Sequence, residues 1–399
     1  MIGYQAFADL SLSTDSNERG HAAHLAAQAY LDHSGPADEH AALYAALIGF
    51  LDDPSVKVRA ALAYGLLHSP EVPRPIILAL LRDSPVIARA VLQYSPVLVD
   101  ADLMPLIRSG DAGGLVAIAQ RPKISGKIAA ALVEAGDDNL VLRLLQRMDV
   151  PLPKDVLATL TLKYRGDARL RGALLARRDL PAEARMVLVR CVAESLRKCR
   201  LVKGALAPDR LDRVLRDGTD TALSAIGEMA ASGGDYARSL VQHEQVSTRV
   251  LLHAVLTGHV MFFSSCLTAL AEVSESKVFS LLETGSRTAL MALFGRAGLR
   301  EGVARVLARL ILHARLADLS DDLAARHYVV TALTEEMIAE YDGDIPAELE
   351  EVFTYLSEQN ITLARKAARG VVSAFAGSRE GVIALPMAEA GEVRALTAA

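Results

Sequence analysis

Two histidines near the start of the chain have a spacing that could serve metal binding. His21 and His24 lie three residues apart, so a helix would place both imidazoles on one face. Glu18 is the only nearby carboxylate in register, and no cysteine is close. A metal site needs more ligands than this pair supplies. We therefore interpret the pair as part of a solvated polar face.

Three later histidines lie in the least polar stretch of the chain, 241–273: His243, His253 and His259. No cysteine or carboxylate stands at a metal-ligand spacing from them. We expect them to be histidines of the core or of a groove. No metal site and no cofactor site is predicted.

Other possible reactive groups also lack their partners. Cys191 and Cys199 lie eight residues apart with no histidine between them, and with Cys266 they predict scattered buried thiols in a reducing compartment. Gly113-Gly114 lacks the Lys-Ser/Thr of a phosphate loop and predicts a turn. The turn at 342–346 lacks the ligand series of a calcium loop. Gly-x-Ser-x-Gly, His-Glu-x-x-His and Cys-x-x-Cys do not occur, so no catalytic residue and no enzyme activity is predicted.

The composition favours a helical, cytoplasmic protein. Hydrophobic residues make up 51 % of the 399 residues, yet no apolar run approaches the ~20 residues of a membrane span. The N-terminal residues have no basic start followed by an apolar core, so we expect no signal peptide. Alanine and leucine are abundant and aromatics make up only 5 %, which predicts an all-α fold.

One sequence segment occurs twice. Residues 51–62 return as residues 81–92 at an offset of 30, with Asp, Val, Arg, Ala and Leu in register. Gly110-Asp111 and Gly136-Asp137 form a weaker echo at an offset of 26, each a helix-ending glycine followed by a capping aspartate. Beyond residue 153 the period fades. Repeated helical pairs predict an α-solenoid, or superhelix, with a second half of irregular helical repeats.

The repeated Asp…Val-x-x-Arg pattern resembles the HEAT repeat family. The resemblance implies that Asp53, Arg59, Asp83 and Arg89 form a structural ladder between neighbouring repeats. Residues 38–320 as a whole look like an uncharacterised alphaproteobacterial family, a domain of unknown function with HEAT-like repeats. That resemblance implies a bacterial cytosolic protein and no established reaction.

Turn signals divide the chain into four predicted regions. A leading helix in 1–36 is followed by the repeat array of 37–216, a second helical region of 217–376 and a loose tail of 377–399. The boundary between the two helical regions is placed at the turn-like segment Asp217-Gly218-Thr219-Asp220.

Charge separates along the chain although its sum is only −5. Residues 163–216 contain 15 Lys and Arg against 6 Asp and Glu, whereas residues 317–358 contain 12 Asp and Glu against one Arg. These two regions could meet within one chain or between two chains as a homodimer. One helix, predicted over 182–203, offers a basic ridge to a partner: Arg185, Arg190, Arg197, Lys198, Arg200 and Lys203. The alternative is an amphipathic helix whose charges are solvated.

These patterns favour a non-enzymatic scaffold for protein–protein interaction with unidentified protein partners. The alternative is a HEAT-like protein that binds nucleic acid, or acts on DNA lesions, through the basic 163–216 face. The absence of Trp and the negative net charge count against that alternative. A regulator of signalling on the same fold is a third hypothesis, which rests on fold analogy alone.

Overall fold

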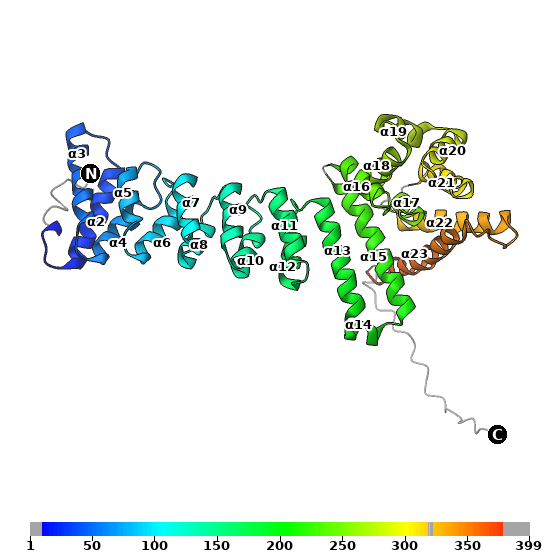
Figure 1. Ribbon diagram of the computed structural model, residues 1–399, viewed down its shortest axis with the longest axis horizontal. Coiled ribbons are helices and arrows are strands. Elements are labelled where there is room, and N and C mark those ends of the chain that lie inside the picture. Colours follow the sequence, from blue (N-terminus) through cyan, green and yellow to red (C-terminus); the bar gives the residue numbers. More distant parts are fainter. Residues whose placement is uncertain (1–9, 231, 318, 320–321, 378–399) are drawn as a thin grey trace, which may run out of the picture. The chain divides into compact units, whose positions relative to one another are not determined.

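The computed structural model (Figure 1) describes residues 10–230, 232–317, 319 and 322–377. This described part consists of helices α2 to α23 with no strand, which confirms the all-α fold class. The chain divides into two compact units, unit 1 (Met1–Val192) and unit 2 (Ala193–Ala399). Apart from Gly377, where α23 ends, the predicted tail lies outside the described residues.

Unit 1 starts with α2 (Ser16–Leu31) and continues in pairs of helices, each an odd-numbered helix followed by an even-numbered one. In Figure 1 the odd-numbered helices α5 to α11 follow one side of unit 1 and the even-numbered helices α4 to α12 the other. Helices two positions apart pack together, as α4 does with α6 and α6 with α8. The bounds are α3 (Ala37–Leu51), α4 (Val56–Leu66), α5 (Arg74–Leu80), α6 (Pro85–Tyr94), α7 (Asp100–Ser109), α8 (Ala112–Ala119), α9 (Gly126–Ala135), α10 (Asp138–Gln146), α11 (Lys154–Tyr164) and α12 (Ala168–Ala176).

The Gly-Asp echoes end one helix and cap the next. Asp111 accepts a hydrogen bond from the Gly114 N–H at 2.6 Å, and Asp137 accepts one from the Leu140 N–H at 2.8 Å, so both predicted caps are confirmed. Gly110 has φ +72, the left-handed conformation expected of a glycine that ends a helix. Gly136 is extended instead. The predicted turn at Gly113-Gly114 is wrong, because these residues form the first turn of α8.

Arginine–aspartate pairs join successive helical pairs. Arg19 of α2 binds Asp53 at 2.8 Å, and Arg59 of α4 binds Asp83 at 2.6 Å. The hydrogen bond from Arg59 holds the pKa of the Asp83 carboxyl below its usual value. Three of the four residues assigned to a structural ladder therefore lie in such contacts. Arg89, the fourth, is exposed and lies over Gly113, where an added Cβ would collide with its guanidinium.

A second set of arginines, which the sequence reading missed, binds main-chain carbonyls. Arg121 donates to carbonyls at the end of α6, Arg147 to carbonyls at the end of α8, and Arg177 to carbonyls at the end of α10. The last carbonyls of a helix have no partner inside that helix, so each guanidinium satisfies the end of the preceding pair. We call these three the carbonyl-binding arginines.

The carbonyl-binding arginines extend the repeat along the chain. Arg147 and Arg177 lie 30 residues apart, and each is followed two residues later by an aspartate that it also binds. The Asp…Val-x-x-Arg pattern fades beyond residue 153 as expected, but contacts with the 30-residue spacing do not. The repeat continues to α12, but in the residues that contact the main chain rather than in the Asp…Val-x-x-Arg pattern.

Several helices of unit 2 are longer than those of unit 1. Two boundaries predicted from the sequence differ from those in the structure. The helix predicted over 182–203 breaks at Cys199, whose backbone is extended. The turn predicted at Asp217–Asp220 lies inside α15. The bounds are α13 (Ala182–Lys198), which begins in unit 1, α14 (Arg200–Ala205), α15 (Pro208–Met229), α16 (Gly233–Gln242), α17 (Thr248–Leu256), α18 (Val260–Ala271), α19 (Glu275–Thr284), α20 (Arg287–Arg296), α21 (Glu301–Ala314), α22 (Leu323–Glu340) and α23 (Glu350–Gly377).

Tertiary contacts explain why α15 continues through its turn-like segment. Leu211, Leu215 and Leu223 are buried on one side of this helix. Asp217 and Asp220 lie three residues apart, and both bind the same arginine of α17. These contacts outweigh the modest helix preference of Asp and Gly. The two compact units divide at 192/193, within α13, whereas the sequence predicted a division at 216/217.

Some carboxylates of the acidic segment, residues 317–358, form ion pairs with arginines of unit 2. Glu340 of α22 binds Arg305 at 2.9 Å and Arg309 at 2.6 Å, and Glu336 lies 3.7 Å from Arg309.

None of the described helices has the length and apolar character required to cross a membrane.

Candidate functional site

The six residues of the predicted basic ridge have different environments. Arg185 is half-buried and donates to the carbonyls of Leu175, at 2.8 Å, and of Arg177. Burial lowers the pKa of its guanidinium. Arg185 thus continues the series of carbonyl-binding arginines, which corrects its assignment to the ridge. Arg190 is exposed on the part of α13 that belongs to unit 1.

The other four ridge residues, Arg197, Lys198, Arg200 and Lys203, are exposed in unit 2. There the end of α13, α14 and the start of α15 surround an open groove of about 1090 Å³. Arg197 and Lys203 line it together with Arg216. Arg197 is held by Asp212 at 3.1 Å. The groove therefore combines basic side chains with the apolar floor of Leu206 and Leu211.

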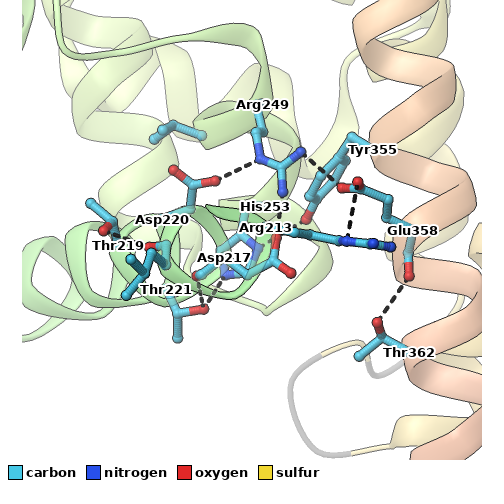
Figure 2. A network of polar contacts seen from close by, with 12 residues as sticks. Arg213, Asp217, Thr219, Asp220, Thr221, Arg249, His253, Tyr355, Glu358 and Thr362 are labelled. Carbon is cyan, nitrogen blue, oxygen red and sulfur yellow. Dashed lines mark hydrogen bonds and ion pairs between the residues drawn. The ribbon is translucent and has the colours of Figure 1, made fainter. Parts of the chain in front are cut away.

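A network of polar side chains in unit 2 surrounds Arg249 of α17 (Figure 2). Its guanidinium binds Asp217 and, at 2.8 Å, Asp220 of α15, and it binds Glu358 of α23 at 3.3 Å. The ring of Tyr355 lies beneath it, 4.8 Å from the guanidinium carbon. We call these five residues the Arg249 cluster. It ties three helices, α15, α17 and α23, to one side chain.

A chain of hydrogen bonds continues from Tyr355 to α15. His253 lies 2.9 Å from the Tyr355 hydroxyl through Nδ1 and 3.1 Å from Thr221 Oγ1 through Nε2. Thr221 donates its proton to the Asp217 carbonyl, so it must accept from His253 Nε2–H. The network therefore assigns the neutral tautomer of His253 with the proton on Nε2, and Tyr355 donates to Nδ1.

His259, the residue before α18, contacts α15 one turn beyond Thr221. Its Nδ1 lies 2.9 Å from both Ser224 Oγ and Thr257 Oγ1. Both hydroxyls donate to main-chain carbonyls, so the single Nδ1–H of His259 is shared between them. His253 and His259 are the buried and half-buried histidines expected at these positions, whereas His243 is exposed.

Burial decides the protonation of these groups. Burial lowers the pKa of His253 to about 4, and the nearby His259 and Arg249 act in the same direction. Burial also raises the pKa of the Tyr355 hydroxyl. Burial raises the pKa of the carboxyls of Asp217 and Asp220, while Arg249 opposes that rise. We regard both aspartates as charged at neutral pH because the Arg249 guanidinium contacts both directly.

The arrangement is suited to holding helices rather than to moving protons. Tyr355 and His253 are 1 % and 5 % exposed, so neither reaches a bound substrate as an acid or base must. The thiol of Cys266 is buried, and burial raises its pKa to about 12. Within the described ranges, no three His, Cys, Asp or Glu side chains form a group able to hold a metal ion.

The sequence contained a signal for the Arg249 cluster that we did not use. Arg249 is the only Lys or Arg within the least polar stretch, 241–273. A single guanidinium in an apolar helix needs carboxylate partners. Asp217 and Asp220, three apart and therefore on one helical face, were instead assigned to a turn.

Because His253 is neutral in the folded chain, acid should destabilise unit 2. The unfolded chain takes up this proton near pH 6.5 and the folded chain only near pH 4, so the contribution is complete above pH 6.5 and is lost as pH falls toward 4. The loss amounts to roughly 3 kcal/mol. Urea unfolding at several pH values measures it. His253→Gln should flatten this dependence and His243→Gln should not, and equal slopes in the two variants would contradict the assignment.

Comparison with known proteins gives one match. The model of a family described as an uncharacterised protein conserved in bacteria (DUF2336) matches residues 87–337. This range includes Asp217, Asp220 and Arg249 but not Tyr355 or Glu358. No similar curated protein and no similar solved structure was found.

Proposed function

The chain belongs to the DUF2336 family of uncharacterised bacterial proteins, and from this premise we propose that it is a non-enzymatic scaffold that binds a protein partner through unit 1. The helical pairs of unit 1 are HEAT-like repeats of an α-solenoid in this proposal. The ladder contacts and the carbonyl-binding arginines support it, because both recur between successive pairs. The narrower alphaproteobacterial subgroup and the cytoplasmic location remain predictions.

The observation that carries the proposal is a repeat of exposed apolar side chains. Val56 and Tyr64 of α4 are 45 % and 69 % exposed, and Val86 and Tyr94 of α6 are 75 % and 40 % exposed. Val86 lies 30 residues after Val56, and Tyr94 lies 30 residues after Tyr64, which is the offset of the repeated segment. Burial in the core explains the repeated leucines but not these four residues. Exposed aromatic side chains are typical anchors of protein interfaces.

The surroundings of the two tyrosines favour a polypeptide ligand. Tyr64 stands beside His24 of α2, with ring centroids 5.7 Å apart, and Tyr94 stands beside His68 at 5.2 Å. Next to Tyr64 a shallow groove of about 520 Å³ runs between α2 and α4, with Lys57 and His21 among its polar lining residues. Apolar rings with polar neighbours can hold side chains of a peptide and bond its main chain.

Replacement of both tyrosines should remove the partner. We expect Tyr64→Ser combined with Tyr94→Ser to lower recovery of the partner from a native lysate at least tenfold, since interface tyrosines contribute on the order of 2 kcal/mol each. Affinity capture followed by quantitative mass spectrometry measures this. The matched control is Leu162→Ser, which removes an exposed apolar side chain from α11. Equal recovery by both variants would contradict the proposal.

The nucleic-acid alternative has less support. A basic face needs guanidinium groups that are free to reach phosphates. In the 163–216 region Arg177 and Arg185 bind main-chain carbonyls instead, which leaves residues 196–216 as the exposed, strongly basic part of that region. A gel shift that weakens with salt would nevertheless favour nucleic acid over a protein partner.

A further inference from the structure

A short segment of unit 2 presents both positive charge and apolar side chains to solvent. We call residues 196–216 the basic tip; it comprises the end of α13, α14 and the first turns of α15. It contains seven Lys and Arg against two Asp. Leu201 is 85 % exposed, and Leu196 and Val214 are also exposed. An exposed surface of this kind marks an interaction site.

Most of the charge of the basic tip is unused inside unit 2. Arg197 pairs with Asp212. Arg213 lies 3.9 Å from the carboxylate of Glu358. Among the residues with described positions, no carboxylate lies within ion-pair distance of four other cations, namely Arg200, Lys203, Arg210 and Arg216. These four charges are therefore available to pair with carboxylates of a partner.

A complementary surface lies on the same unit. We call residues 335–351 the acidic hairpin; it comprises the end of α22, the following turn and the start of α23. It contains eight Asp and Glu and no Lys or Arg. Glu336 and Glu340 pair with arginines of α21. Within the described part of the chain the remaining six have no ion pair, and Ile338 beside them is 44 % exposed.

We propose that a second copy of this chain is the partner, with the basic tip of each copy docked on the acidic hairpin of the other. Both surfaces belong to one compact unit. Within it Arg216 of the basic tip lines a pocket together with Glu350 and Glu351 of the acidic hairpin, but no described ion pair joins a free charge of one surface to a free charge of the other. A two-fold axis lets each copy supply both surfaces, so the contact forms twice. Exposed Leu201 and Ile338 supply apolar contact next to the charges.

The charges permit a reciprocal test on the full chain. The tip variant carries Arg200→Glu and Lys203→Glu, and the hairpin variant carries Glu335→Lys and Asp344→Lys. All four side chains are exposed, so both variants should keep the unfolding midpoint of the native chain. Light scattering after size exclusion measures the mass at low and high salt.

We expect the native chain to have twice the mass of one chain at low salt and to dissociate at high salt, where the charges are screened. Each variant alone should have the mass of one chain. An equal mixture of the two variants should restore the doubled mass, because each reversed tip then faces a reversed hairpin. A native chain that is monomeric at low salt, or variants that dimerise as the native chain does, would overturn the proposal. So would flotation of monomeric native chain with vesicles of anionic lipid, which would assign the basic tip to a membrane surface.

Discussion

Replacement of Arg249 by methionine is expected to destabilise unit 2 by about 3–5 kcal/mol at neutral pH. Methionine fills much of the same volume but leaves Asp217 and Asp220 half-buried without a counter-charge. It also removes the contact of α17 with Glu358 of α23. An ionised carboxylate that has lost its partner in a buried site is strongly unfavourable.

The stability lost by Arg249→Met should be smaller in acid than at neutral pH. Without Arg249, the folded-state pKa of Asp217 and Asp220 should rise further above the unfolded value, since burial already raises it. A raised folded pKa contributes stability at low pH that disappears as pH increases through it. The deficit of Arg249→Met relative to the native chain should therefore shrink in acid. Urea unfolding at neutral and acidic pH, with hydrogen exchange of α15, α17 and α23, measures the effect.

Two further variants make the prediction specific. Arg238→Met removes an exposed pair with Asp235 and should change stability by less than about 1 kcal/mol. Arg249→Met combined with Asp217→Asn and Asp220→Asn should recover part of the loss, because α15 then carries no unpaired charge and Glu358 still has Arg213 at 3.9 Å. Equal unfolding midpoints for Arg249→Met and Arg238→Met would show that the cluster does not hold α15, α17 and α23 together.

The parts of the fold that sequence could predict are those encoded by local pattern. The doubled segment at 51–62 and 81–92 predicts helical pairs because its leucines and capping residues repeat within single helices. Asp111 and Asp137 cap the helices that follow them, as local sequence rules require.

The parts that sequence could not predict depend on partners distant in the chain. Asp217 and Gly218 are local turn formers. They continue a helix because leucines of α15 are buried on either side of them and because the guanidinium of Arg249, about thirty residues later, binds Asp217. Arg185 follows a helical pattern that suits a solvated face, yet it binds carbonyls at the end of α12. The main-chain acceptors of such an arginine leave no pattern in the sequence, because carbonyls are common to all residues. The only sequence mark of Arg147 and Arg177 is the aspartate two residues after each of them.

The carbonyl-binding arginines should be as important to unit 1 as Arg249 is to unit 2. Arg177 is the clearest case, since its side chain is only 1 % exposed and donates to the carbonyls of Leu145, Arg147 and Val150. Asp179 pairs with the same guanidinium at 2.6 Å. Arg177→Met would leave the carbonyls at the end of α10 without donors in a buried site.

We expect Arg177→Met to destabilise unit 1 by roughly 3–5 kcal/mol, because each buried polar group left without a partner costs about 1–3 kcal/mol. Arg178→Met is the matched control, since Arg178 is the next residue and is exposed; it should change stability by less than about 0.5 kcal/mol. Denaturant unfolding gives both values, and hydrogen exchange should show faster exchange in α10 and α12 for Arg177→Met alone. If the two variants unfold at the same urea concentration, contacts between the apolar faces alone hold the successive pairs together, and the arginines add specificity without measurable stability.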